Sequence, residues 1–456
     1  MSSVDSLLSF LEFTYIYWKL KFFLMHKKVR LTALSFVVLL SIYANAQSEF
    51  LIGDALPDAP ILSERGDYGV GVQALEFVNK NQPDILNIAD GKAPIYDRKI
   101  TVEAWYPATI PNGTKEIEEY TQVLGRNGTE GRPVVPFTFK GRALRNAKIL
   151  QESKKYPLVI LSHGYVGSRF LFTYLAENLA SKGYVVVSID HTDSTYKDAA
   201  NFTSTLVNRS LDQLFVLNEI DKLSQPESGS FLSGMVDVSK TGLVGYSMGG
   251  YGGLNTCGAG YSEAAVGFYK SMTGGNTALD ERTMSSKSYK KMMDSRIKAF
   301  VAMAPWGMTR GVWDDKGLAG LEVPTFFIAG SEDDISGYEK GIKAIYQGAI
   351  NSDRYLLTYI NARHNVAPNP PTVETMQKGL NIDEYLRYAD SVWDMRRINN
   401  VNQHFITAFL GIHLRGEDNM EYLDLEPNAN TGNWKGFKPR TSVGMELLHE
   451  TPITQN

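Results

Sequence analysis

The chain has 456 residues, of which 43% are hydrophobic, and a formal net charge of −4. This length and apolar content suffice for a large core, and α/β folds with insertions reach this size as one domain. The lack of a basic excess argues against a nucleic-acid partner. The single cysteine, Cys257, excludes an intramolecular disulfide, so we expect the core to supply the stability.

The first 46 residues differ from the rest. A basic stretch at 25–30 precedes an apolar run at 31–43, and Ala44-Asn45-Ala46 matches the small-residue pattern before a cleavage site. This order predicts a secretory signal peptide cleaved near 46/47, and hence a secreted or periplasmic protein. The alternative is an uncleaved anchor, but the apolar run is shorter than the ~20 residues of a membrane span. We therefore expect no stable membrane span after signal removal. Met25 is an alternative start, which leaves the translation of residues 1–24 open.

We expect residues 47–456 to form one domain. Its N-terminal extension holds two strand-like runs, 70–78 and 99–106, the second with alternating apolar and polar residues. Residues 107–155 are polar, with Gly and Pro interspersed, and this pattern predicts long surface loops.

From Tyr156 onward, buried-strand patterns alternate with helical ones. Strands are expected at 157–161, 184–189, 241–244, 298–303, 325–329 and 355–359, and helices at 170–181, 205–223, 338–349 and 397–414. Continuous apolar strands between helices predict an α/β fold, with a mostly parallel central sheet covered by helices on both faces. In such sheets the chemistry lies at the carboxyl ends of the strands.

The pentapeptide from Gly245 to Gly249 reads G-x-S-x-G and follows an apolar run. Such a motif between strand and helix is typical of a nucleophile elbow, where a strained turn exposes the serine hydroxyl. A chance occurrence in a loop is the alternative. Because the motif follows a predicted strand, we expect Ser247 to be a nucleophile.

Two further residues follow later predicted strands. Asp333 comes after 325–329, and His364 comes after 355–359. A serine nucleophile needs a base for its proton, and a carboxylate to orient and stabilise that imidazole. The order Ser, Asp, His is that of α/β-hydrolases. Ser247, Asp333 and His364 are therefore the predicted catalytic residues, with Asp334 as the rival acid.

The oxyanion hole needs two backbone N–H donors. One is expected from Met248, after the nucleophile, and the other from Tyr165, in the loop after the first parallel strand. We expect His163 to brace this loop rather than to act as a base.

Trp306 follows a strand beside the elbow, so it is either a core residue or a side chain that stacks on the substrate. The Tyr165 ring is a second candidate substrate contact, on the acyl side of the substrate. The segment 258–294 is longer than a plain connection needs, and is interpreted as an insertion near the pocket rim or as a surface helix.

Several segments resemble the platelet-activating-factor acetylhydrolase and dienelactone-hydrolase-like esterases of the α/β-hydrolase superfamily. They are His163-Gly164-Tyr165, residues 175–184, residues 245–250 and the strand that ends at 104–108. The resemblance extends over most of residues 66–415. Other segments are similar to bacterial cutinase-type polyester hydrolases: residues 247–250, 304–306, 323–333 and 364–369.

The two groups of relatives differ in the position of the acid. In eukaryotic platelet-activating-factor acetylhydrolases it follows the strand after the nucleophile, where residues 303–306 of this chain hold no carboxylate. Cutinase types carry it at the position of Asp333, so the resemblance favours Asp333. Dienelactone hydrolases use a cysteine nucleophile, and Ser247 in that place argues against dienelactone cleavage.

These patterns predict a serine carboxylic-ester hydrolase that forms an acyl-enzyme and needs no cofactor or metal. The expected partner is a small-molecule, lipid or polyester ester, as in platelet-activating-factor acetylhydrolases or cutinases. One alternative is a peptidase or amidase on the same fold. The other is a catalytically inactive binding protein, although such proteins usually lose a member of the catalytic triad and this chain retains all three residue types.

Overall fold

The computed structural model describes residues 14–15, 17–25, 49–289 and 293–453. The chain divides into two units, Met1–Phe50 and Leu51–Asn456. In the first unit, residues 17–25 are helical. None of the helices within the described residues is long and apolar enough to cross a membrane. The predicted signal-peptide run at 31–43 and its cleavage junction lie outside the described residues.

In the second unit, the described residues form one large sheet of eleven strands. Their order across the sheet is β13 (Met445–Glu450), β12 (Arg354–Tyr359), β11 (Thr325–Gly330), β10 (Ile297–Met303), β9 (Val236–Tyr246), β7 (Tyr156–Ser162), β8 (Val185–Asp190), β2 (Ile95–Thr109), β1 (Gly69–Pro83) and β5 (Leu144–Arg145), while β6 (Lys148–Ile149) pairs with β2. The six strands from β12 to β8 are parallel to one another. Antiparallel pairs flank them, β12 with β13 on one side and β8 with β2 and β2 with β1 on the other. The prediction of a mostly parallel sheet is confirmed.

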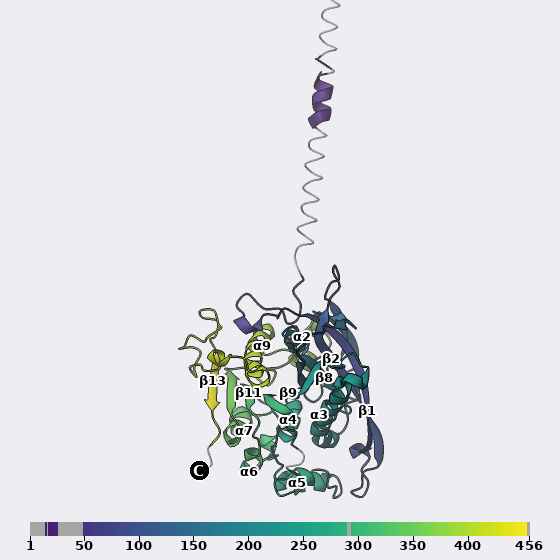
Figure 1. Cartoon of the computed structure of the whole chain (residues 1–456), viewed down its shortest axis with the longest axis vertical. Helices are drawn as coiled ribbons and strands as arrows, with labels where there is room; N and C mark the ends of the chain where they lie inside the picture. Colours follow the sequence, from purple (N-terminus) through teal and green to yellow (C-terminus); the bar gives the residue numbers. More distant parts are fainter. Residues whose placement is uncertain (1–13, 16, 26–48, 290–292, 454–456) are drawn as a thin grey trace, which may run out of the picture. The chain divides into compact units, whose positions relative to one another are not determined.

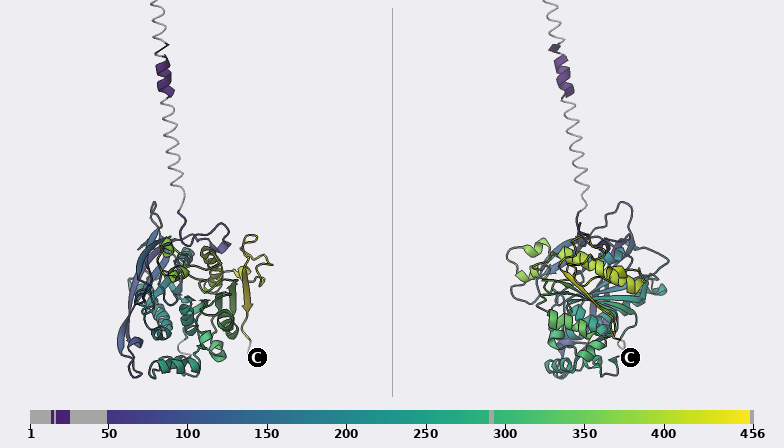
Figure 2. Two further views of the ribbon diagram at one scale, coloured as in Figure 1. Left: turned by 180° about the vertical axis from the view of Figure 1, so that it is seen from behind. Right: turned by 90° about the vertical axis from the view of Figure 1, so that its left-hand side faces the viewer.

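Helices cover both faces of this sheet (Figures 1 and 2). Phe326 of β11 contacts Phe405 and Phe409 of α9 (Met395–Leu410), whereas the next residue, Phe327, contacts Tyr346 of α7 (Lys343–Gly348). Because neighbouring residues of a strand point to opposite faces, α9 and α7 lie on opposite sides of the sheet.

The remaining helices complete the two layers. Helix α2 (Thr173–Ser181) packs against α9, and α3 (Phe202–Ser224) packs against α4 (Met248–Thr256). The other α-helices of the described residues are α5 (Glu263–Met272), α6 (Asp315–Ala319) and α8 (Ile382–Leu386).

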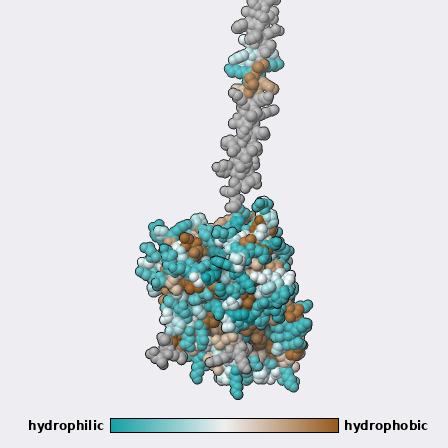
Figure 3. All heavy atoms as spheres, in the orientation of Figure 1, coloured by the Kyte–Doolittle hydropathy of each residue, from teal (hydrophilic) through white to brown (hydrophobic). Residues whose placement is uncertain are grey.

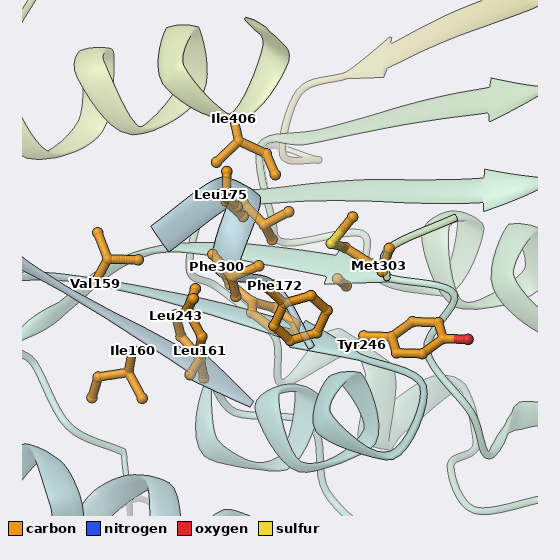
Figure 4. Packing of buried hydrophobic residues seen from close by; sticks show 14 of the residues in the cluster. Val159, Ile160, Leu161, Phe172, Leu175, Leu243, Tyr246, Phe300, Met303 and Ile406 are labelled. Carbon is orange, nitrogen blue, oxygen red and sulfur yellow. The ribbon is translucent and has the colours of Figure 1, made fainter. Parts of the chain in front are cut away.

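The core lies between the central strands and these helices. Every residue of β7 is buried, as are all but one of β10. Figure 4 shows buried side chains of both strands, among them Ile160 and Phe300, together with Leu243 of β9 and Ile406 of α9, and all four belong to one core cluster. Each fully buried large apolar side chain stabilises the fold by about 1.5–3 kcal/mol. The face shown in Figure 3 is mostly hydrophilic, with scattered apolar residues. This surface agrees with the large set of apolar side chains that are buried in the core.

The prediction of long loops over residues 107–155 is wrong. This segment holds a hairpin of β3 (Glu118–Leu124) and β4 (Val135–Gly141). Tyr120 and Phe139 are directly paired and buried, and the Tyr120 hydroxyl donates a hydrogen bond of 2.7 Å to Glu177. One face of the hairpin is solvated, so polar residues alternate with these buried aromatic ones. The polar residues make the segment polar on average, and its composition therefore indicated loops instead of strands.

Candidate active site

The predicted elbow joins β9 to α4. Ser247 stands between them with φ 51° and ψ −112°, in a backbone region that few non-glycine residues adopt. A Cβ at Gly245 would lie 2.3 Å from the carbonyl oxygen of Gly249, and a Cβ at Gly249 would lie 1.9 Å from that of Ser162. Both glycines are therefore required by close backbone contacts. Together they allow the strained turn that presents the Ser247 side chain at the carboxyl end of the strand.

The His364 side chain is paired with the Asp333 side chain. Nδ1 of His364 lies 2.8 Å from Oδ2 of Asp333, while Oδ1 accepts hydrogen bonds from the N–H groups of Ile335 (2.9 Å) and Ser336 (2.8 Å). Burial by itself would raise the pKa of Asp333, but the His364 contact and the two N–H donors outweigh it and hold that pKa below its ordinary value. An ionised Asp333 fixes the proton of His364 on Nδ1 and leaves Nε2 free to act as a base.

The rival acid has a different partner. Asp334 forms an ion pair with Arg363, and both side chains are nearly half exposed. Of the two adjacent carboxylates, Asp333 is therefore the one that contacts His364.

Ser247 and His364 line the same cavity, which has a volume of about 340 Å³. Each is mostly buried, with 7% and 8% of its surface exposed. Within the described residues no hydrogen bond joins the Ser247 hydroxyl to His364; such contacts are often long in unliganded sites and tighten with substrate. The cavity thus brings a hydroxyl and an oriented imidazole to one concave surface.

The two predicted oxyanion donors flank Ser247. Met248 is the first residue of α4, where an N–H group has no partner inside the helix. Tyr165 lines the cavity, and its N–H makes no hydrogen bond to another described residue. A Cβ at the adjacent Gly164 would lie 3.2 Å from Cβ of Ser247, so this loop runs directly beside Ser247.

The Tyr165 side chain is held at its hydroxyl. It donates to the carbonyl oxygen of Ala200 at 2.6 Å and accepts from Arg126 at 3.0 Å. Its ring also packs edge-to-face on Phe202. These contacts fix the ring while its backbone remains available to the cavity.

A buried polar chain begins at Ser162, directly before residues 163–167, which we call the oxyanion loop because they include the predicted donor Tyr165. Ser162 ends β7, and its hydroxyl lies 2.8 Å from Nε2 of His191, whose Nδ1 lies 3.0 Å from Oδ2 of Asp212. Arg98 contacts both oxygens of Asp212, at 2.8 and 2.9 Å. Burial, and then the charge of Arg209, lower the pKa of His191 to about 3, so its ring is neutral. Its Nδ1–H therefore donates to Asp212, and its Nε2 accepts from Ser162.

The same chain reaches the elbow and the loop. Gln213 donates to the Ser162 hydroxyl at 2.9 Å and to the carbonyl oxygen of Gly249 at 3.2 Å. His163 is fully buried, and its Nδ1 contacts the carbonyl oxygen of Gly164 at 2.6 Å. It thus has the bracing contact expected of it. Sequence patterns did not reveal the part of Gln213, since a buried glutamine within a helix carries no recognisable signal.

Neither Trp306 nor the described part of the segment 258–294 lines the cavity. Trp306 packs edge-to-face against Phe202 and Tyr251 and is not among the residues that line the cavity. Its role as a substrate contact stays a prediction. No residue of the described part of 258–294 lines the cavity either.

The wall opposite the elbow comes instead from α8 and residues 386–391, which the sequence did not single out. The Tyr246 hydroxyl donates to Asn365 at 2.7 Å, and Asn365 donates in turn to the carbonyl oxygen of Leu386. Tyr246 precedes Ser247 and Asn365 follows His364, so these hydrogen bonds connect the wall to the neighbours of both residues. Polar hydrogen bonds across such long sequence separations leave no local pattern.

The mixed sheet and the helices on its two faces form the α/β-hydrolase fold. The family model for "Platelet-activating factor acetylhydrolase, isoform II" matches residues 61–220. A Thermobifida alba protein, "Cutinase est1", is 24% identical over 220 residues, 48% of this chain and 56% of that protein. The platelet-activating factor acetylhydrolase of Cavia porcellus is 27% identical over 187 residues, 40% of each chain. The matches thus span about half the length of these curated relatives.

A solved structure extends the likeness of fold. A ferulic acid esterase from Streptomyces cinnamoneus has a TM-score of 0.50 and 19% identity, over 80% of this chain and 93% of that one. The chain thus has the α/β-hydrolase fold, and the proteins that it is similar to are esterase-type hydrolases.

Proposed function

We propose that this protein is a serine esterase that cleaves carboxylic esters through an acyl-enzyme. The observation that carries the proposal is the hydrogen bond between His364 and Asp333 in the cavity that also exposes the strained Ser247. The substrates proposed are esters with small or lipid-like acyl groups, as the names of the similar acetylhydrolases and cutinases suggest.

The proposed reaction follows from the positions of the side chains. Ser247 Oγ attacks the ester carbonyl carbon as Nε2 of His364 takes its proton, and Asp333 stabilises the resulting imidazolium. The N–H groups of Met248 and Tyr165 hold the oxyanion; one such donor is worth roughly 3–4 kcal/mol in the transition state. His364 returns the proton to the leaving alkoxide. Water then releases the acid by the same steps, so the reaction is written without a cofactor.

The test is hydrolysis of 4-nitrophenyl butyrate by the wild type and by Ser247→Ala. Loss of the nucleophile should lower kcat by a factor on the order of 10⁴–10⁶. Retention of activity in this variant would overturn the proposal. A fluorophosphonate probe distinguishes an inactive binding protein, which it would leave unlabelled. Faster cleavage of peptide-like amides than of esters would point to the peptidase alternative.

Export is a separate part of the proposal, and it rests on the leader pattern of residues 25–46. Mass spectrometry of the protein recovered from a secreting host should find an N-terminus near residue 47. An intact leader on the recovered protein would contradict it.

A further inference from the structure

Two arginines line the cavity that holds Ser247. The side chains of Arg132 and Arg387 are only 13% and 17% exposed. Nη2 of Arg132 and Nη1 of Arg387 are buried and make no hydrogen bond to any described residue. A buried donor without an acceptor is costly, and more so when it is charged. Each of these two guanidinium groups, which line the cavity, therefore has one buried donor that still lacks an acceptor among the described residues.

The nearby carboxylates, Glu384 and Asp383, leave these two arginine donors without a hydrogen bond. Glu384 is buried between the two arginines: Oε1 accepts from Nε of Arg132 at 2.7 Å, Oε2 accepts from the N–H of Gly125 at 2.8 Å, and Oε2 lies 3.8 Å from Nη1 of Arg387. One carboxylate thus serves two guanidinium groups. Asp383 pairs with Arg132 at 2.9 Å but is 55% exposed, so solvent screens it. In this inner part of the wall, one buried carboxylate therefore faces two guanidinium groups.

The other charged groups of the cavity already have partners. Asp334 and Arg363 pair with each other nearer to solvent. Asp390 accepts from the N–H groups of Arg363 (2.7 Å), Val392 (2.8 Å) and Trp393 (2.9 Å). Asp334 and Asp390 therefore already have donors, while Arg387 and Arg132 each keep one donor without an acceptor among the described residues.

Arg387 is also held in place. Its guanidinium lies over the ring of Tyr196, 4.5 Å from the centroid, and Tyr196 lines the cavity as well. Leu386, the residue before Arg387, accepts a hydrogen bond from Asn365 at its carbonyl oxygen. A guanidinium fixed on an aromatic face binds a planar carboxylate with little further loss of side-chain freedom.

We propose that the cavity binds esters that carry a second, ionised carboxylate, with Arg387 and Arg132 as its recognition site. The substrate class is the half-ester of a dicarboxylic acid. Its ester group lies at Ser247, and its free carboxylate accepts hydrogen bonds from the guanidinium groups. This inference rests on the proposed esterase function and specifies the substrate of that site.

The experiment compares mono-4-nitrophenyl adipate and suberate with their methyl-capped counterparts, which differ only in the missing charge. The readout is the ratio of kcat/KM for the free carboxylate over the capped ester, measured by nitrophenol release. For the wild type this ratio should exceed about 10, the value of one charge-assisted hydrogen bond. Arg387→Met should lower the ratio at least ~10-fold, mainly through KM, and Arg387→Lys should restore part of it.

Arg296→Met is the matched control. Arg296 is also a partly buried, paired arginine, but it directly precedes β10 and so lies at the end of the sheet away from Ser247. Its substitution should leave the ratio as in the wild type. A wild-type ratio near 1, or an unchanged ratio in Arg387→Met, overturns the proposal.

A binding measurement separates this proposal from the catalytic one. Calorimetric titration of monomethyl adipate into Ser247→Ala should show binding that weakens at least ~10-fold when Arg387→Met is added. If no ester is cleaved but this difference appears, the esterase function fails and the carboxylate site stands. If no binding occurs, or the double variant binds equally well, the carboxylate site is refuted whatever the activity.

Discussion

Oδ2 of Asp333 lies 2.8 Å from Nδ1 of His364, and the other oxygen of this carboxylate accepts two backbone N–H groups. The carboxylate is thus fixed on both sides before any substrate arrives. Its neighbour Asp334 points to Arg363 near solvent. Two adjacent acids therefore have different environments, and their roles can be separated by substitution.

Asp333→Asn should lower kcat for 4-nitrophenyl butyrate by a factor on the order of 10³–10⁴, because an amide in this position favours the wrong tautomer of His364. Asp334→Asn should lower it far less, since its partner is Arg363 near solvent. Steady-state kinetics of both variants is the measurement. A larger loss in Asp334→Asn than in Asp333→Asn would show that the acid has been assigned to the wrong residue.

Substitution by alanine should have opposite effects at Gly249, in the elbow, and at Gly267, in α5. Gly249→Ala would place a Cβ 1.9 Å from the Ser162 carbonyl oxygen, which must shift the elbow and should cost ~10²-fold in kcat. Gly267 lies on the exposed side of α5 with nothing within 4 Å of the added atom. Gly267→Ala should stabilise the protein by about 0.5–1 kcal/mol. Thermal unfolding and kcat measured for both variants test the pair, and a stabilised, fully active Gly249→Ala would refute the account of the elbow.

Asp212→Ala removes the centre of the buried chain behind the oxyanion loop. It leaves the buried Arg98 and His191 short of a partner, and the loss of one member of a buried ion pair costs about 3–5 kcal/mol. Asp237→Ala is the control, because its contact with Lys240 is long (3.6 Å) and partly exposed, and it should cost less than about 1 kcal/mol. Denaturant unfolding of both variants is the measurement. Equal losses would mean that the buried chain contributes no more than a surface pair.

Glu177 should make stability depend on pH. Burial raises its pKa from 4.5 to about 7, although Arg65 and the Tyr120 hydroxyl oppose that shift. The folded state therefore binds this proton more tightly than the unfolded state does. The stability that it contributes is fully present below pH 4.5 and is lost as the pH rises through about 7, a change of about 3 kcal/mol at 1.36 kcal/mol per unit.

Glu177→Gln removes that titration. The difference in unfolding free energy between the wild type and this variant should shift by about 3 kcal/mol in favour of the variant between pH 4 and pH 8. Unfolding in denaturant at several pH values measures it, with Glu130→Gln as a control for loss of an exposed charge. A difference that does not change with pH would contradict the assigned shift.

The sequence by itself determined the parallel sheet, the elbow at Ser247 and the positions of Asp333 and His364 after later strands. These features are local: continuous apolar strands, glycines in close backbone contact and polar residues just past a strand end. Each leaves a pattern within a few neighbouring residues, which is why a single chain reveals them.

Only the tertiary structure decided what depends on distant segments. It showed which of two adjacent acids contacts His364 and that a polar stretch forms the β3–β4 hairpin. It also showed that residues near Arg387, rather than the described part of 258–294, line the cavity. Register and side-chain packing join residues far apart in the chain, as Tyr246 and Asn365 are joined across 119 positions. Such contacts are fixed by the summed geometry of the whole sheet, and no local pattern records them.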